Sequence, residues 1–299
     1  MTRQTGLRPR RYGRVVARVA IVAALICGGL ILRTLDPLNL AAAVRWPWPS
    51  TTVVTLYFGD GALLFPVSRR MADGEDLPRR AIEALLAGPP ATGRALTSLL
   101  PQGVTLRSVR TDGDVTHVDL GSPAELDDAV HAVSAIVATL TRLPGVEAVW
   151  LSVNGVPVSA TPIRRPMAYY ASADGLVAVP LDVADPRAAV DAYLARPPGS
   201  RLVTLPADAR LLGYAFDETD GLVSLRFAYT ESLRTLAIER PAAIRSLLLG
   251  LIATLTEQPG VRAVYLDFGG QSRLGLGQCS DLLRVRQARP FLLNDERLL

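Results

Sequence analysis

The stretch ATLTRLPGVEAVWL, from Ala138 to Leu151, occurs again 115 residues later as ATLTEQPGVRAVYL, from Ala253 to Leu266. Ten of the fourteen positions are identical, and self-similarity at such a distance indicates a duplicated structural unit. Each copy has the pattern of a helix end, a Pro-Gly stop and an apolar run that enters a core strand. The repeated stretch is therefore a structural joint, and we expect two complete domains that each need it once.

The first copy is predicted from the segments on either side of its motif. Gly59-Asp60-Gly61 and Thr111-Asp112-Gly113-Asp114 are turns between β-rich runs, Pro78 stands at a first helical position, and Ser122-Pro123-Ala124-Glu125 is a capping box. The expected elements are strands at 51–58 and 62–67, a helix at 78–87, strands at 104–110 and 115–120, a helix at 123–142 and a strand at 146–153. One apolar face of the second helix is formed by Leu126, Val130, Val133, Val137 and Leu140.

The second copy repeats this order. Asp185 precedes Pro186 as a better N-cap for its first helix, and the turn 217–220 separates two hairpin strands. The expected elements are two short strands within 168–180, a helix from 186, strands at 210–216 and 221–229, a helix at 241–257 and a strand at 261–268. The predicted fold is α+β, with two tandem β-(β)-α-β-β-α-β domains, each a mostly antiparallel sheet with two helices on one face.

The N-terminus is predicted to anchor the chain in a membrane. The first 33 residues hold seven arginines and no acid, around an uninterrupted apolar run of fourteen residues from Val19 to Leu32. This run spans ~21 Å as a helix, and a start at Val15 with Arg18 snorkelling extends it to ~27 Å. A transmembrane helix at 15–35 with the arginines inside places the rest of the chain outside the cytoplasm, as a single-pass protein of the bacterial cell membrane. A signal peptide cleaved at Ala41–Ala43 and lipidation at Cys27 are the alternatives.

The expected boundaries follow from these segments. They are a basic cytoplasmic segment at 1–14, the anchor at 15–35, a Pro/Trp linker at 36–50, the first domain at 51–158, a linker at 159–166, the second domain at 167–276 and a C-terminal tail at 277–299. Outside the first 33 residues the chain has 25 basic and 28 acidic residues, so the globular part lacks the basic character of a nucleic-acid-binding protein.

Several short motifs, in the same order twice, resemble the GerMN domain family. They are TLYF in the first strand, LLAGPP at 85–90, LLP at 99–101, VDLG at 118–121 and ATLTRLPGV at 138–146. The second copy departs from this pattern, because Arg196 replaces the glycine of LLAGPP and RFAY stands in place of VDLG. The resemblance implies an exported, membrane-tethered or lipidated protein associated with sporulation, germination or the cell envelope. It implies no enzymatic activity and supplies no catalytic residues.

The residues themselves predict no catalytic, metal or cofactor site. The chain has two histidines, His117 and His131, and neither has a partner at metal-ligand spacing. A Gly-x-Ser-x-Gly nucleophile motif is missing from the sequence, and the glycine-rich stretch 269–277 lacks the lysine of a phosphate-binding loop. Of the two cysteines, Cys27 lies in the apolar run, and Cys279 is the single thiol of the exported part; it has no histidine near it in the sequence, which favours an inert side chain. We therefore expect a non-catalytic binding or assembly protein of the envelope; the alternative is an envelope hydrolase or other enzyme with an unrecognised site.

Strand alternation identifies a candidate partner-binding surface. Thr116, Val118 and Leu120 are expected to face the helices, as are Val223, Leu225 and Phe227 in the second copy, so their neighbours face the other side of each sheet. The outward residues are Trp150, His117, Asp119, Tyr265 and Arg226. The two aromatic side chains either cover the sheet or a neighbouring domain, or anchor a partner, namely another envelope protein or a cell-wall component. No nucleic acid is expected as a partner, and the lipid bilayer is contacted through residues 15–35.

The two copies of the second helix are expected to share their core positions. Val133 corresponds to Leu248, Val137 to Ile252 and Leu140 to Leu255. Leu249 replaces Ser134 and points about 100° away from its own apolar face. We expect Leu249 to pack against another element, which is the first domain, the C-terminal tail or a partner.

Overall fold

A computed structural model describes residues 50–91, 95–123, 130–183, 185–195, 202–269 and 273–299. The expected anchor at 15–35 and the linker up to residue 49 lie outside these ranges. None of the helices within these ranges has the length and apolar character needed to cross a membrane. Residues 50–299 form one compact unit.

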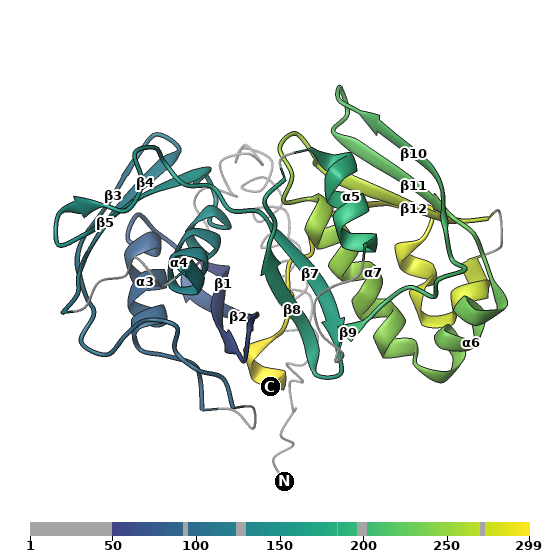
Figure 1. Ribbon diagram of the computed structural model, residues 1–299, viewed down its shortest axis with the longest axis horizontal. Helices are drawn as coiled ribbons and strands as arrows, with labels where there is room; N and C mark the ends of the chain where they lie inside the picture. Colours follow the sequence, from purple (N-terminus) through teal and green to yellow (C-terminus); the bar gives the residue numbers. More distant parts are fainter. Residues whose placement is uncertain (1–49, 92–94, 124–129, 184, 196–201, 270–272) are drawn as a thin grey trace, which may run out of the picture. The chain divides into compact units, whose positions relative to one another are not determined.

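The elements of the first copy follow the predicted order (Figure 1). They are β1 (Thr51–Asp60), β2 (Leu63–Ala72), α3 (Leu77–Leu86), β3 (Thr105–Asp112), β4 (Val115–Gly121), α4 (Val130–Thr141), β5 (Ala148–Val153) and β6 (Val156–Pro157). Within the capping box, Ala124 and Glu125 lie outside the described residues.

The second copy repeats the order with additions. Its elements are β7 (Met167–Ser172), β8 (Gly175–Pro180), α5 (Pro186–Leu194), β9 (Leu202–Val203), β10 (Leu211–Asp217), β11 (Leu222–Phe227), α6 (Glu231–Glu239), α7 (Pro241–Leu255), β12 (Ala263–Phe268), η1 (Arg273–Leu282), β13 (Arg286–Ala288) and η2 (Glu296–Leu298). The Asp185 carboxylate accepts a hydrogen bond from the Ala188 amide at 2.7 Å, as expected of an N-cap. Helix α6 was not anticipated from the sequence.

The sheet arrangement corrects the prediction of one mostly antiparallel sheet in each domain. The strands form two four-stranded sheets, β3-β4-β5-β6 and β10-β11-β12-β13, and a separate five-stranded sheet, β1-β2-β8-β7-β9. Strands β4 and β5 are parallel, as are β11 and β12. The physical reason is the intervening helix, because a strand that follows a helical crossover returns to the sheet in the same direction.

The five-stranded sheet joins the two copies. The hairpin β1–β2 and the hairpin β7–β8 meet where Leu64 pairs with Ala178. Strands β2 and β8, to which these residues belong, are equivalent in the two repeats. The shared sheet is therefore built from the equivalent hairpin of each repeat. The duplication thus gives two copies that share a sheet, whereas two self-contained domains were expected.

Helices α4 and α7 lie between two sheets, and this placement changes their burial. Helix α4 contacts β1 as well as β5, and α7 contacts β7 as well as β12. All residues from Ala132 to Leu140 are buried, so α4 lacks the single apolar face that periodicity predicted. Val130, expected in that face, is 51% exposed. A helix that is covered by a sheet on both sides has no solvent-exposed face, so its sequence needs no polar side and shows no amphipathic pattern.

The matched core positions of α4 and α7 are all buried, as predicted. Leu249 is half-buried and packs against the main core. Gly250 lies so close to β7 that a Cβ atom there would clash with the Tyr169 carbonyl oxygen. One turn later, Thr254 accepts a hydrogen bond from the Tyr169 amide at 2.8 Å.

A buried polar cluster connects the two copies. The hydroxyl groups of Tyr57 and Tyr169 are 2.5 Å apart, and Arg142 donates to Tyr169 at 2.6 Å and to Glu257 at 2.5 Å. Arg289 also forms an ion pair with Glu257. Burial raises the pKa of the Glu257 carboxyl, but the guanidinium groups of Arg289 and Arg142 outweigh burial and hold this pKa below its ordinary value of 4.5. The Glu257 carboxylate therefore stays charged inside the protein at neutral pH.

Residues 277–299, which we expected to form a tail, are part of the folded unit. Strand β13 pairs with β12, as β6 pairs with β5 in the first copy. Asn294 then donates to the carbonyl groups of Pro66 at 2.6 Å and Leu176 at 2.8 Å, one in each copy. Glu296 accepts two hydrogen bonds from Arg69 at 2.6 and 2.7 Å. The C-terminal residues therefore bind both copies.

Candidate partner-binding surface

In the first copy the predicted surface residues lie on the outward face of β4 and β5. His117 pairs with Trp150 in the parallel register, and their rings are stacked with centroids 6.2 Å apart. Thr116, Val118 and Leu120, which alternate with His117 and Asp119 along β4, are buried. The alternation of inward and outward residues was therefore predicted correctly. Both aromatic side chains are half-buried, and they leave part of their surface open to a partner.

Asp119, on the same face, stabilises the turn between β5 and β6. Its carboxylate accepts hydrogen bonds from the Ser152 hydroxyl at 2.8 Å and from the Gly155 amide at 3.0 Å. Arg107 lies 3.9 Å away. These contacts fix the β5–β6 turn, and they use acceptor positions that a ligand would otherwise occupy.

In the second copy the same strand positions carry different chemistry. The registers of β4–β5 and β11–β12 place Arg226 where the first copy has Asp119, and Asp267 where it has Ser152. Asp267 accepts from Arg284 at 2.8 Å and from Arg226 at 3.2 Å. Burial raises the pKa of Asp267, but the two guanidinium groups hold it below its ordinary value. The Arg226 side chain remains 65% exposed and offers donors to an anionic group.

A groove of about 360 Å³ runs over this outward face. Its lining includes Leu212, Gly213, Ala215, Ser224, Arg226 and Tyr265. Tyr265 corresponds to Trp150, so an aromatic side chain occupies the same place on the outward face of both copies. The structure does not bring the five predicted residues together: three belong to one sheet and two to the other.

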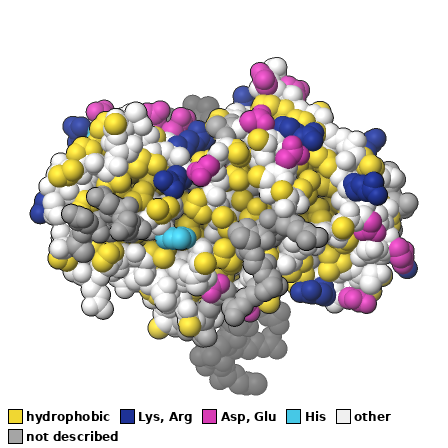
Figure 2. Space-filling view, in the orientation of Figure 1, with side chains coloured by type: hydrophobic (Ala, Val, Ile, Leu, Met, Phe, Trp, Pro, Cys, Tyr) yellow, Lys and Arg dark blue, Asp and Glu magenta, His cyan; other side chains and the backbone are white. Residues whose placement is uncertain are grey.

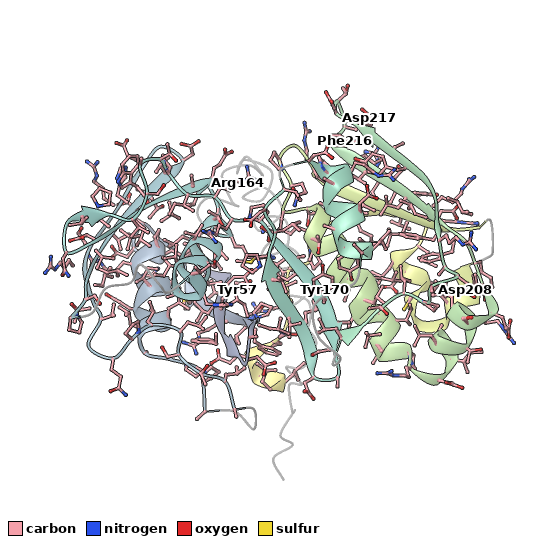
Figure 3. All side chains as sticks on the ribbon, viewed as in Figure 1. Tyr57, Arg164, Tyr170, Asp208, Phe216 and Asp217 are labelled. Carbon is pink, nitrogen blue, oxygen red and sulfur yellow. The ribbon has the colours of Figure 1, made fainter. Side chains whose placement is uncertain are left out.

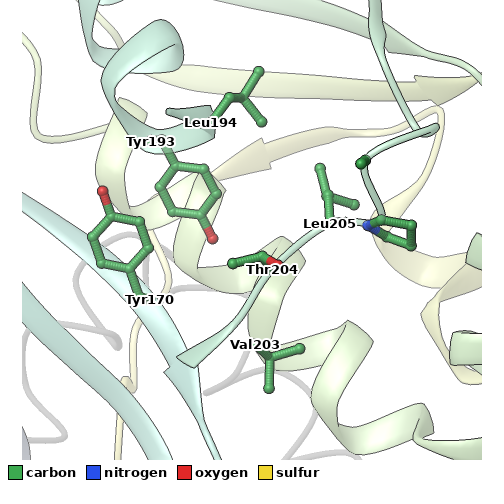
Figure 4. Close-up of a pocket in the computed structure, with 8 residues that line it drawn as sticks. Tyr170, Tyr193, Leu194, Val203, Thr204 and Leu205 are labelled. Carbon is green, nitrogen blue, oxygen red and sulfur yellow. The ribbon is translucent and has the colours of Figure 1, made fainter. Parts of the chain in front are cut away.

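A second cavity, of about 500 Å³, was missed by the sequence reasoning (Figure 4). Tyr170 and Tyr193 stack at its edge with ring centroids 4.9 Å apart, and Tyr193 donates to the Leu247 carbonyl at 3.0 Å. Burial raises the pKa of both phenols, so they stay neutral at physiological pH. The described lining residues carry no charge, which suits an apolar group. No signal in the sequence separates these tyrosines from ordinary core aromatics.

The described residues contain no group of three or more histidine, cysteine or acidic side chains placed to hold a metal ion. His131 is exposed at the start of α4 and lies apart from His117, which stacks on Trp150. Burial raises the pKa of the Cys279 thiol to about 11, so this side chain is protonated at neutral pH and a poor nucleophile. Figure 2 shows charged side chains of both signs scattered over one face of the molecule, with no continuous basic surface there.

Comparison with known families decides the relationship. A family model described as Germane, sporulation and spore germination, matches residues 55–159 and again residues 167–273. The chain belongs to the GerMN family. The two matched segments are the two copies described above, and together they cover more than half of the chain.

The GerMN fold is also found in solved structures. The tandem GerMN domains of the sporulation protein GerM from Bacillus subtilis match with a TM-score of 0.60 and 21% identity, over 82% of this chain and 99% of that one. The first GerMN domain of the same protein alone covers 38% of this chain, with a TM-score of 0.30 and 23% identity. A search of curated proteins finds no match. The likeness to tandem GerM shows that both proteins share the double fold.

Proposed function

We propose that this GerMN protein is a non-catalytic binding or assembly protein of the bacterial envelope, held in the membrane through residues 15–35. The observation that carries the proposal is the aromatic side chain on the outward sheet face of each copy, Trp150 and Tyr265. Large aromatic residues supply a disproportionate share of binding energy at protein interfaces. An envelope protein or a cell-wall component is the proposed partner.

The polar junction supports this proposal. Arg142 and Glu257 are 6% and 7% exposed and bind each other from different copies. Asn294 adds hydrogen bonds to both copies. These contacts hold the two repeats in a fixed relative orientation, and with them the two outward sheet faces. A fixed orientation lowers the entropic cost of binding one partner at both faces.

Site-specific photocrosslinking tests the proposed surface. Trp150 and Tyr265 are replaced, one at a time, by the photoreactive amino acid p-benzoylphenylalanine in the full-length chain, and intact membranes are irradiated. A discrete crosslinked product is expected from one or both positions, because a bound partner lies within reach of the new side chain. His131, exposed on α4, is the matched control position and is expected to give no such product.

Equal products from all three positions, or none from Trp150 and Tyr265, would argue against the surface.

Membrane fractionation of the same cells tests the anchor. Deletion of residues 1–49 is expected to move the chain from the membrane fraction to the soluble fraction. Retention of the shortened chain in the membrane would contradict the anchor.

A further inference from the structure

The two four-stranded sheets each end in a strand with one partner. Strand β3 pairs with β4, and β10 pairs with β11; neither has a second neighbour among the described strands. Figure 1 shows β10 at the outer side of its sheet. Such an edge carries unpaired backbone groups and is a template for another strand unless charges or irregularities protect it.

The two edges are equivalent in geometry and opposite in character. Both hairpins shift register at the same place, with Arg107 as the extra residue in β3 and Leu212 in β10. Strand β3 also carries Arg110 and Asp112, which guard it with charge. Strand β10 has no charged residue from Leu211 to Phe216, and Leu212 is 60% exposed. Strand β10 therefore keeps the register shift of β3 but lacks the charged side chains that protect the edge of the first repeat.

The charged residue within β10 is Asp217 at its end, and two further charged residues flank the strand. Arg210 precedes the strand and Glu218 follows it, and both side chains are exposed. Neither residue has an ion-pair partner in the part of the chain that the structure describes. Phe216 and Asp217 mark the end of the strand next to Glu218 (Figure 3). A positive start and a negative end make the edge complementary to an antiparallel copy of itself.

We propose that β10 pairs with β10 of a second copy of this chain, around a twofold axis at Tyr214, the middle residue of the strand. This register places Arg210 opposite Glu218 of the other copy, twice. It also places Leu211 opposite Asp217, Leu212 opposite Phe216, and Gly213 opposite Ala215. The sheet β10-β11-β12-β13 of one chain and the same sheet of the other chain then form one sheet of eight strands.

A second molecule of this chain fits this edge better than an unrelated strand, because the charges at the two ends of β10 are complementary to those of the same strand in reversed direction. One strand supplies both halves of each ion pair, as a twofold interface requires. The same pairing at β3 would place the charged residues Arg107, Arg110 and Asp112 of both chains along the new strand pair, and it is disfavoured because charged side chains on an edge strand oppose such pairing. The groove proposed for the envelope partner borders this pairing, because Leu212, Gly213 and Ala215 of β10 line it together with Arg226 and Tyr265 of the neighbouring strands.

Charge exchange in the full-length chain tests the pairing. Two differently tagged copies are expressed together, solubilised in detergent and purified through one tag, and the recovery of the other tag is measured. Arg210→Glu in both copies, or Glu218→Arg in both copies, places like charges opposite each other at two sites. Either variant is expected to lower recovery about ten-fold.

A mixture of one Arg210→Glu copy and one Glu218→Arg copy is expected to restore recovery, because opposite charges then face each other again. Arg110→Glu, the same chemical change on β3, is the matched control and is expected to behave like the wild type. Thermal unfolding midpoints confirm that each variant is folded. The proposal is overturned by a wild type that recovers no second copy, by single variants that pair normally, or by a mixture that fails to recover.

Discussion

At the scale of single residues, the differences between the two motif copies are more informative than the identities. Arg142 corresponds to Glu257, and these two side chains meet at the junction. The next position, Leu143 in the first copy, is Gln258 in the second. Both are buried, but the amide atoms of Gln258 have no hydrogen-bond partner in the described part of the chain. Duplication followed by divergence has thus left one unsatisfied polar side chain in a core position.

We predict that Gln258→Leu stabilises the protein by about 1–2 kcal/mol, because a buried amide without partners costs about this much. The backbone already suits leucine: the amides at 143 and 258 donate to Leu140 and Leu255 at 2.9 and 3.0 Å. Chemical denaturation measures the change. The reverse substitution, Leu143→Gln, is expected to destabilise by about 2 kcal/mol. An unchanged or lower stability of Gln258→Leu contradicts the explanation.

At the scale of elements, the distance between α7 and β7 depends on a missing side chain. Gly250 faces the Tyr169 carbonyl oxygen, whereas the equivalent position in α4 is Ala135. Glycine inside a helix lowers its stability by about 1 kcal/mol relative to alanine. Close packing of the helix on the shared sheet offsets this loss.

We predict that Gly250→Ala lowers the free energy of unfolding by about 1–2 kcal/mol, since overpacking outweighs the gain in helix propensity. Ser246→Ala, one turn earlier on α7, is the control and is expected to change stability by less than about 0.5 kcal/mol. Thermal or denaturant unfolding distinguishes the two. A stabilised Gly250→Ala protein would show that helix and strand separate easily.

At the scale of the whole molecule, one buried carboxylate holds the junction between the copies. Glu257 binds Arg142, Arg289 and Tyr169. Its folded-state pKa lies below the ordinary value of 4.5, so its contribution to stability is complete above that value. The contribution decreases as the pH falls through the folded-state pKa, because the protonated carboxyl no longer pairs with the two guanidinium groups.

We predict that Glu257→Gln lowers stability by about 3 kcal/mol at pH 7, because it leaves buried guanidinium charge uncompensated. The loss relative to the wild type is expected to shrink as the pH falls below 4.5, where the wild-type carboxyl also becomes protonated. Unfolding curves from pH 7 to pH 3 measure both effects. Glu231→Gln, an exposed partner of Arg234, is the control with little effect. A constant difference across this range would contradict the assigned role.

The order of the elements and the inward or outward direction of strand residues could be predicted from the sequence. Both depend on local patterns: Pro-Gly stops, Asp-Gly turns, and the twofold alternation that buries Val118 and Val223 while leaving His117 and Arg226 outside. The outward position of Trp150 and Tyr265 follows from the same alternation. The repeat itself identified the two copies.

Other features were decided only by the tertiary structure. Tyr57 meets Tyr169 across 112 positions of the chain, and Arg142 meets Glu257 across 115. Helix α4 is covered on both sides because the hairpin β1–β2 leaves its own copy's four-stranded sheet for the shared one. No local periodicity encodes such pairings, since each depends on which surfaces remain unburied after both copies have formed. The partner of a strand or a buried charge is therefore chosen by long-range packing, whereas its own conformation is chosen by its neighbours in the chain.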